Sequence, residues 1–574
     1  MLGSDSIEAR LIQRGSPFQL EDASIGGITY KVFPKGPQIL SDLYRKAAAA
    51  AEREYIVTCD SRVNYGEVLS SARRLARHLE DKAGVVPGKH IAIVMPNCAD
   101  WIISFIAITA IGAVVVAIHA ELTPQEIELR LLNTDCVAVI CDPERGSAIS
   151  ASRFRGSIIA TGTPEDPQFQ RDWLSHRALL AEQPPEVEGE AFEFPRSVPP
   201  DSLALIACTS GSSGTPKGVV LTHRNLVTGL MNMMLGGALC SARAPRGKPQ
   251  APASQPTRPC GLILAPLSHI SGYAQMLLMM YIAGKIVLAT RWQVSEVVDL
   301  VEKESVRSIS GATPAMLREL VRAVRLAQSP GSLSSFFING AALQGPLIRE
   351  LMAAFPTATV STGYGLTETC GSISVVAGAD LLERPTTSGR VLPSVSIRLT
   401  NAAGDEVPIG EPGEISIRGA MVMQAYWGDI SKTAEVLQDG WFRTGDLGRL
   451  DAAGHLEVID RVQDIIASDG QQFSSTEIER ALLSIERVDD AAVLGHVSIA
   501  GRDELLVAVV TDLLEADLPE THAKLRRRIP GLPAAVRLSA CSAFPLTASG
   551  KVDRPALKRN LVQLLTASAV PTDL

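Results

Sequence analysis

Residues 209–218 combine the residue types that bind phosphate. They read TSGSSGTPKG and lie between two apolar runs, Ala204–Cys208 and Val219–Leu221. Serine, threonine and glycine offer hydroxyls and backbone N–H groups in a tight turn, and Lys217 adds a point charge. The segment is not a Walker A motif, because Pro216 stands where that motif has a glycine before the lysine. By composition alone it is either a phosphate-binding loop or a flexible turn.

The full string resembles the phosphate-loop signature of the acyl-adenylate-forming superfamily, which includes acyl-CoA synthetases, adenylation domains of nonribosomal peptide synthetases and firefly luciferase. The resemblance runs from about residue 40 to about residue 560, with further motifs in the expected order, and its pattern is closest to fatty-acid-type ligases. It implies that ATP activates a carboxylic acid as acyl-AMP, and that the acyl group then passes to a thiol. It assigns the phosphate-binding role to these residues: Thr209, Ser210, Gly211, Ser212, Ser213, Gly214, Thr215 and Lys217.

A second motif, GYGLTE at residues 363–368, resembles the nucleotide motif of the same superfamily. The resemblance implies that Tyr364 stacks on adenine, with Gly365 beside it, and that Thr367 contacts the AMP phosphate. It also implies that Glu368 holds Mg²⁺. A single carboxylate beside substrate phosphates suits this hard cation, which prefers oxygen ligands.

Three more segments complete the implied nucleotide site. The resemblance places Gly340, Ala341 and Ala342 beside adenine and the acyl pocket. Asp446, which ends WFRTGD, would accept hydrogen bonds from both ribose hydroxyls, since a carboxylate offers two acceptor oxygens. Arg461 would reach the ribose or a phosphate. It belongs to a hinge segment that has Gln463 where the family usually has Asp or Lys.

The C-terminal segment PLTASGK, residues 545–551, resembles the family loop that carries the adenylation lysine, here Lys551. Together with Thr209 and Lys217, this lysine would neutralise the charge of two anionic reactants. In the family, the small domain then rotates, removes the lysine and opens a tunnel for pantetheine. Gly470 matches the tunnel glycine, where any Cβ would narrow the passage.

The segment PLSHISG, residues 266–272, matches the motif that lines the acid pocket, with His269 as the gate beside the carboxylate. Amino-acid-activating relatives have an Asp just after this position to pair the α-ammonium group, and this chain has Ile270. An unpaired ammonium in an apolar pocket is costly, so we expect a fatty or aryl acid without an α-amine. The Met-rich stretch Gln275–Tyr281 either lines that pocket or belongs to the core.

The acceptor is predicted to be CoA, because the insertion of specialised fatty acyl-AMP ligases is absent after Ala342. Loading of an acyl carrier protein remains an alternative. A non-catalytic acyl or nucleotide sensor is a third possibility, although Lys551, Glu368 and Asp446 are all retained. The predicted cofactors and co-substrates are ATP, Mg²⁺ and CoA.

Strands and helices alternate in the first third of the chain. The sequence predicts strands at His90–Met95, Val114–Ile118 and Val137–Cys141, and a helix at Glu126–Thr134 that begins with a Thr123 capping box. This order predicts an α/β fold with mainly parallel, doubly wound sheets and a small β-subdomain. The apolar run Ile102–Ile118 is interpreted as a helix, a glycine break and a strand rather than a membrane span.

The 574 residues are too many for one ordinary core, and we expect an N-terminal domain at 1–461 and a mobile α+β domain at 462–574. A hairpin region is predicted at Thr444–Ile459, a helix after Ser474, and a mobile surface loop at Ser241–Pro259. The net charge of −8 gives no sign of nucleic-acid binding. The nine cysteines lack metal-ligand spacing and the N-terminus lacks a signal peptide, which predicts a cytoplasmic protein.

Overall fold

The computed structural model describes most of the chain, and the chain divides into two compact units. The first comprises Met1–Arg384, Ser388–Ile397 and Ile417–Phe442, and the second Pro385–Thr387, Arg398–Ser416 and Arg443–Leu574. The domain boundary expected after residue 461 remains a prediction. The described residues are 6–161, 173–175, 194–209, 217–243, 258–289, 292–327, 331–338, 345–468, 471–497, 503–511, 517–529, 531–532, 535–546 and 552–568.

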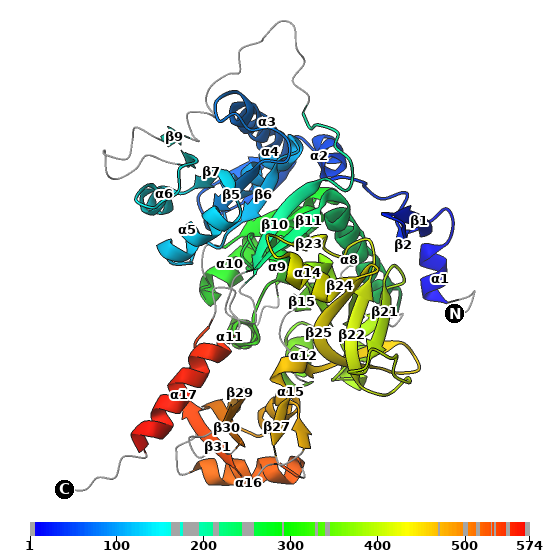
Figure 1. Cartoon of the computed structure of the whole chain (residues 1–574), viewed down its shortest axis with the longest axis vertical. Helices are drawn as coiled ribbons and strands as arrows, with labels where there is room; N and C mark the ends of the chain where they lie inside the picture. The colour runs from blue at the N-terminus through cyan, green and yellow to red at the C-terminus, as the bar shows by residue number, and fades with distance from the viewer. Residues whose placement is uncertain are drawn as a thin grey trace, which may run out of the picture. The chain divides into compact units, whose positions relative to one another are not determined.

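The first unit contains an eight-stranded sheet with the order β23-β11-β10-β6-β5-β7-β8-β9 (Figure 1). The strands from β10 to β9 pair in parallel, whereas β11 runs antiparallel to both β10 and β23. This confirms the predicted doubly wound arrangement. The strands are β5 (His90–Val94), β6 (Val114–Ala117), β7 (Cys136–Cys141), β8 (Ser157–Ala160), β9 (Trp173–Ser175), β10 (Leu203–Thr209), β11 (Lys217–Thr222) and β23 (Ala425–Tyr426).

The apolar run at residues 102–118 supplies one central strand of this sheet and most of a helix that packs on it. Helix α4 (Ala99–Ala110) ends before Gly112, whose φ of +77° favours glycine, and β6 follows. The predicted helix–glycine–strand order is therefore confirmed. No helix in the described part of the chain is long and apolar enough to cross a membrane, and the cytoplasmic location remains a prediction.

Helix α5 (Pro124–Asn133) begins as the sequence predicts. The Thr123 hydroxyl accepts a hydrogen bond from the Glu126 N–H at 3.3 Å, and the Glu126 carboxylate accepts one from the Thr123 N–H at 2.9 Å. This reciprocal pair satisfies two of the N–H groups that a helix start leaves open. Ile127 and Leu131 of α5 then pack on β6 and β7 in one apolar core.

A second sheet of the first unit runs in the order β20-β19-β16-β15-β14-β12-β13-β3-β4. Helices α10 (Val294–Glu304), α11 (Pro314–Ala327) and α12 (Gly345–Ala354) contribute to one continuous apolar core with it. Its strands are β3 (Glu54–Val57), β4 (Arg62–Asn64), β12 (Cys260–Ile263), β13 (Lys285–Leu288), β14 (Ser308–Ser310), β15 (Ser335–Ile338), β16 (Thr359–Thr362), β19 (Ser374–Ala377) and β20 (Gly389–Val391).

The prediction of a surface loop at 241–259 is wrong at its start. Ser241–Arg243 form the last turn of helix α8 (His223–Arg243). The Ser241 hydroxyl donates to the Gly237 carbonyl at 2.9 Å, and Arg243 pairs with the buried carboxylate of Glu8. These contacts extend the helix into a segment whose composition suggested a loop. Residues 244–257 lie outside the described residues.

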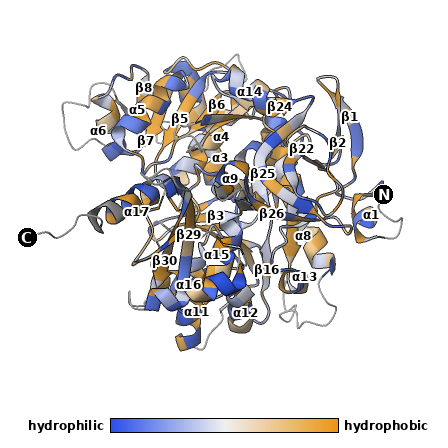
Figure 2. Cartoon of the chain, turned by 60° about the horizontal axis from the view of Figure 1, so that its bottom comes forward, coloured by the Kyte–Doolittle hydropathy of each residue, from blue (hydrophilic) through white to orange (hydrophobic). Residues whose placement is uncertain are grey.

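The second unit contains the predicted hairpin and a separate α+β part. Strands β25 (Trp441–Leu450) and β26 (His455–Arg461) pair antiparallel, with Asp446 opposite Arg461. Strands β29 (Val488–Val497), β30 (Asp503–Thr511) and β31 (Val536–Cys541) form a three-stranded sheet, in which β29 and β30 are antiparallel. Hydrophobic residues dominate β30, whereas α16 (Leu518–Arg528) is largely hydrophilic (Figure 2).

Both faces of this three-stranded sheet are covered. Ala491 and Val493 pack with α15 (Ser475–Leu483) and α16, whereas Ala492 and Leu494 pack with α17 (Arg554–Ser568). Successive side chains of a strand point to opposite faces, so this sheet supplies two separate apolar cores.

The start of α15 depends on one buried carboxylate, Asp460. Its Oδ2 accepts hydrogen bonds from the hydroxyls of Ser474 and Ser475 at 3.0 and 2.9 Å and from the Thr476 N–H at 3.1 Å, while Oδ1 accepts from the Arg461 N–H at 2.8 Å. The Ser474 hydroxyl in turn caps the helix by accepting from the Glu477 N–H at 3.1 Å. Asp460 therefore fixes where the chain leaves β26 and where α15 begins.

We predict that Asp460→Ala lowers the local opening free energy of α15 by roughly 2–3 kcal/mol, because it removes the acceptor of four hydrogen bonds, two of them from buried serine hydroxyls. Amide hydrogen exchange in residues 475–483 measures this directly. Asp460→Asn, which keeps one acceptor oxygen, is expected to lose less. Glu520→Ala, which removes an exposed ion pair with Lys524 in α16, is the control and should change little. Unchanged protection of α15 in Asp460→Ala would contradict this role.

Candidate active site

The phosphate-loop segment enters and leaves the first sheet on neighbouring strands. Strand β10 ends at Thr209 and β11 begins at Lys217, and these two residues face each other in the antiparallel register. The Thr209 hydroxyl lies 3.4 Å from the Lys217 carbonyl oxygen, to which it donates. The sheet thus brings Thr209 and Lys217 together, while Ser210–Thr215 lie outside the described residues.

The GYGLTE segment forms a narrow turn in which Gly365 is required sterically. Strand β17 (Gly365–Leu366) pairs with β18 (Gly371–Ser372), and a Cβ on Gly365 would lie 2.0 Å from the Gly371 carbonyl oxygen. No side chain fits at that distance. Between the two strands, the 3₁₀ turn η2 (Thr367–Thr369) carries the buried Thr367 and the half-buried Glu368. Tyr364, immediately before β17, is also half-buried.

Glu368 is held by a residue that the sequence analysis did not single out. The Tyr426 hydroxyl donates to Glu368 Oε1 at 2.8 Å, and the Met423 N–H donates to the Glu368 carbonyl at 2.7 Å. Among the described residues, no group of three or more His, Cys, Asp or Glu side chains could hold a metal ion. A cation at Glu368 would need further oxygen ligands, and substrate phosphates and water can supply them.

Tyr426 also contacts the lysine of the phosphate loop. Lys217 Nζ lies 5.2 Å from the centroid of the Tyr426 ring, within the range of cation–π attraction. One aromatic side chain thus connects Lys217 to Glu368, two predicted site residues far apart in sequence. An isolated tyrosine in the segment MQAYWGD carries no spacing signal that would have identified it.

His269 stands at the start of α9 (Ile270–Tyr281). It is the N-cap residue, and its Nδ1 accepts from the Ser271 N–H at 3.3 Å and lies 3.1 Å from the Ser271 hydroxyl. The predicted gate residue therefore has a defined orientation at the head of the helix that follows it.

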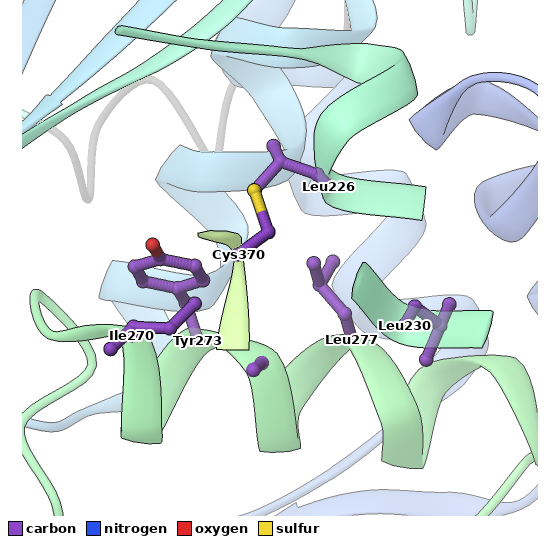
Figure 3. A pocket seen from close by; sticks show the side chains of 7 residues that line it. Leu226, Leu230, Ile270, Tyr273, Leu277 and Cys370 are labelled. Carbon is purple, nitrogen blue, oxygen red and sulfur yellow. The ribbon is translucent and has the colours of Figure 1, made fainter. Parts of the chain in front are cut away.

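A small apolar pocket lies beside α9 (Figure 3). Ile270, Tyr273, Ala274 and Leu277 line it from α9, Leu226 and Leu230 from α8, and Cys370 from the end of η2. It has room for about one water-sized group. Its lining contains no charged side chain.

Two polar groups in this lining are shielded from water. Burial raises the pKa of the Tyr273 phenol and of the Cys370 thiol, so both are neutral near pH 7. Within the described residues, Tyr273 Oη is a buried polar atom without a hydrogen-bond partner.

The methionines that follow His269 belong to the core instead. Met276, Met279 and Met280 are buried, and the Met279 side chain packs closely on Gly261 and Gly284. None of them lines the pocket described above. Of the two interpretations of the Met-rich stretch, the structure supports core packing.

In the second unit, the two predicted ribose-contacting residues pair with each other. Arg461 Nε lies 2.8 Å from Asp446 Oδ1; the Asp446 side chain is 5 % exposed and that of Arg461 is 43 % exposed. The Asp446 N–H donates to the Thr444 hydroxyl at 3.0 Å, and that hydroxyl donates to the Ile415 carbonyl at 2.9 Å. The predicted site residues Gly340, Ala341, Ala342, Gly470 and Lys551 lie outside the described residues.

Comparison with known proteins supports an adenylating enzyme. A family model described as AMP-binding enzyme matches residues 43–427. The chain is 28 % identical to feruloyl-CoA synthase of Amycolatopsis sp over 502 residues, covering 87 % of this chain and 94 % of that protein. It is 25 % identical to long-chain-fatty-acid–CoA ligase of Yersinia pestis over 543 residues, covering 88 % and 92 % respectively.

Among solved structures, the amide bond synthetase from Marinactinospora thermotolerans is similar with a TM-score of 0.76 and 26 % identity, covering 91 % of this chain and 99 % of that one. The predicted α/β fold and enzyme class are confirmed at the level of the family. The predicted use of ATP, Mg²⁺ and CoA agrees with relatives that are named as CoA synthases and CoA ligases. Because the family model matches more than half of this chain, the chain belongs to the AMP-binding enzyme family.

Proposed function

We propose that this enzyme activates a fatty or aryl carboxylic acid without an α-amine as its acyl-AMP and then forms a thioester with CoA. The observation that carries the proposal is the arrangement of Lys217 and Glu368 around Tyr426, directly beside the paired ends of the 209–217 loop. A lysine and a hydrogen-bonded carboxylate at a Ser/Gly loop are what a triphosphate and its counter-ion require.

The first half-reaction joins two anions. A carboxylate oxygen of the acid bonds to the α-phosphorus of ATP, and the bond to the bridging oxygen breaks, releasing pyrophosphate. Lys217 and the hydroxyl and N–H groups of residues 209–215 would bind phosphate oxygens, and Lys551 would approach the reacting groups. This work consists of positioning and preorganised positive charge.

The chain's residues fit a magnesium ion. Glu368 supplies a hard oxygen ligand, and among the described residues its Oε1 alone accepts a side-chain hydrogen bond, which leaves Oε2 for a cation. When bound, Mg²⁺ supplies positive charge to the phosphate oxygens. Tyr364 would stack on adenine, Thr367 would contact the α-phosphate, and Asp446 with Arg461 would bind the ribose.

In the second half-reaction, the thiol sulfur attacks the acyl carbon and AMP leaves. We propose CoA as the thiol, with Gly470 beside its pantetheine arm. Relatives named as CoA synthases and ligases support this acceptor. A carrier-protein thiol is the alternative, and an amine is a further acceptor to test, because one similar structure is an amide bond synthetase.

The acid is proposed from the chemistry next to His269. This chain has Ile270 where amino-acid-activating relatives have an Asp, so an α-ammonium group bound there would lose its hydration without a charged partner. The relatives include an aryl-type and a fatty-acid-type enzyme, and both acid classes are therefore carried in the proposal. His269 would lie beside the carboxylate.

Pyrophosphate release tests the proposal. Fatty, aryl and amino acids are each supplied with ATP and Mg²⁺, and CoA, a holo carrier protein or an amine is added as acceptor. We expect release with fatty or aryl acids, none with amino acids, and acyl-CoA as product. Acylation of the carrier protein or the amine without CoA consumption would replace the proposed acceptor.

We predict that Lys551→Ala reduces acyl-AMP formation by at least about 100-fold, since a preorganised charge at the reacting phosphate is lost. Transfer of the acyl group from preformed acyl-AMP to CoA should remain within about twofold, because that step needs no charge at the phosphate. The two half-reactions are assayed separately. Equal loss of both would show that Lys551 has a different role.

We also predict that Ile270→Asp lowers kcat/KM for fatty and aryl acids at least about tenfold, because a carboxylate next to His269 would repel the carboxylate of the acid. Leu326→Asp places the same group on α11 at a side chain that is 87 % exposed, and it should leave kcat/KM unchanged. Steady-state kinetics on both variants make the comparison. Unchanged acid kinetics in Ile270→Asp would remove Ile270 from the acid site.

A further inference from the structure

Tyr426 lies on a very short strand that joins two parts of the site. Strand β23 pairs antiparallel with β11, with Tyr426 opposite Val219, two residues after Lys217. On either side of this pair, the Gln424 N–H donates to the Val220 carbonyl at 2.9 Å and the Trp427 N–H donates to the Gly218 carbonyl at 2.7 Å. The backbone of Tyr426 is therefore fixed relative to the strand that leaves the phosphate loop.

The side chain of Tyr426 is fixed as well. Only 7 % of the residue is exposed, and its hydroxyl donates to Glu368 Oε1 at 2.8 Å. A glutamate has several rotatable bonds, and an unheld carboxylate samples many orientations. A tyrosine side chain has two rotatable bonds that move its ring, and burial of the Tyr426 ring leaves that ring few orientations. Because the β11–β23 pair fixes Tyr426, this hydrogen bond restricts the orientation of the Glu368 carboxylate.

The face of the same ring contacts Lys217. The ammonium group lies 5.2 Å from the ring centroid, where the negative face of the aromatic ring attracts it. The carboxylate and the ammonium are thus both oriented by Tyr426, one through its hydroxyl and the other through its ring.

We propose that Tyr426 is a positioning residue for acyl-AMP formation, which orients Glu368 toward a divalent cation and Lys217 toward a phosphate. This inference rests on the proposed function, since it needs Glu368 to bind the cation of a metal–nucleotide complex. Residues that hydrogen-bond to a metal ligand typically change metal affinity by about 10- to 100-fold when they are removed. The two contacts can be separated, because phenylalanine keeps the ring and loses only the hydroxyl.

The test uses the full chain and two substitutions. Tyr426→Phe is expected to raise the Mg²⁺ concentration for half-maximal pyrophosphate release about tenfold, with transfer from preformed acyl-AMP to CoA unchanged. Tyr426→Leu also removes the ring and is expected to raise the KM for ATP in addition. Calorimetric titration with ATP and Mg²⁺, without any acid, gives a second readout that does not depend on turnover, and both variants should bind more weakly.

Tyr44→Phe is the matched control. Tyr44 is also buried, and its hydroxyl lies 2.6 Å from that of Thr109, so this variant loses a comparable buried hydrogen bond away from the predicted site residues. It should lower the melting temperature but leave the Mg²⁺ dependence and the nucleotide affinity as in the unmodified enzyme. A purely structural role for Tyr426 predicts that Tyr426→Phe behaves in the same way.

Glu368→Gln separates failure of this inference from failure of the proposed function. If the unmodified enzyme releases no pyrophosphate, or if Glu368→Gln keeps its Mg²⁺ dependence, the proposed function of Glu368 is wrong. If Glu368→Gln shifts the Mg²⁺ dependence and Tyr426→Phe does not, the positioning role is wrong. A shift in both variants, with Tyr44→Phe unchanged, supports the role of Tyr426.

Discussion

Bringing one anion into contact with another is the constraint on which this site depends. Two like unit charges about 4 Å apart repel by about 4 kcal/mol at an effective dielectric constant of about 20. The chain's net charge of −8 does not offset this repulsion, so positive charge has to be local. Lys217 is the described residue that meets this need beside the loop, and its ammonium is held over the Tyr426 ring. The other contributors expected from the sequence are Lys551 and a cation at Glu368.

The order of strands explains why these groups share one place. The register of β10 and β11 sets Thr209 opposite Lys217, and β23 adds Tyr426 to the open side of β11. The Met423 N–H also holds the Glu368 main chain. The turn that carries Glu368, the proposed magnesium ligand, is thereby joined to β11, the strand that begins at Lys217. The sheet supplies the rigidity that electrostatic catalysis requires.

Local patterns in the sequence predicted those structural features that depend on residues close together along the chain. The Thr123 capping box, the glycine break at Gly112 and the strands around the 209–217 loop are all of this kind, and the structure confirms them. Contacts between distant residues could not be predicted in this way. Tyr426 is 58 positions from Glu368, and the pairing of Arg243 with Glu8 spans 235 positions. Single-sequence reasoning therefore singled out Lys217 and Glu368 from their motifs but not Tyr426, which contacts both of them.

The hydrogen-bond and ion-pair partners of three carboxylates in this protein indicate which of the three is suited to bind a cation. Glu304 is buried, and hydrogen bonds and charge from Arg62 and Lys285 hold its pKa below the usual range. Asp446 is paired with Arg461. Both carboxylates are neutralised by side chains of the protein, and a metal ion would have to compete with guanidinium or ammonium groups. Glu368 differs because the side-chain hydrogen bond that it accepts comes from a phenol hydroxyl, which orients the carboxylate without contributing a positive charge. A partner that fixes geometry without adding positive charge suits the magnesium ligand that we propose at Glu368, whereas a lysine or arginine at position 426 would compete with the cation for the carboxylate.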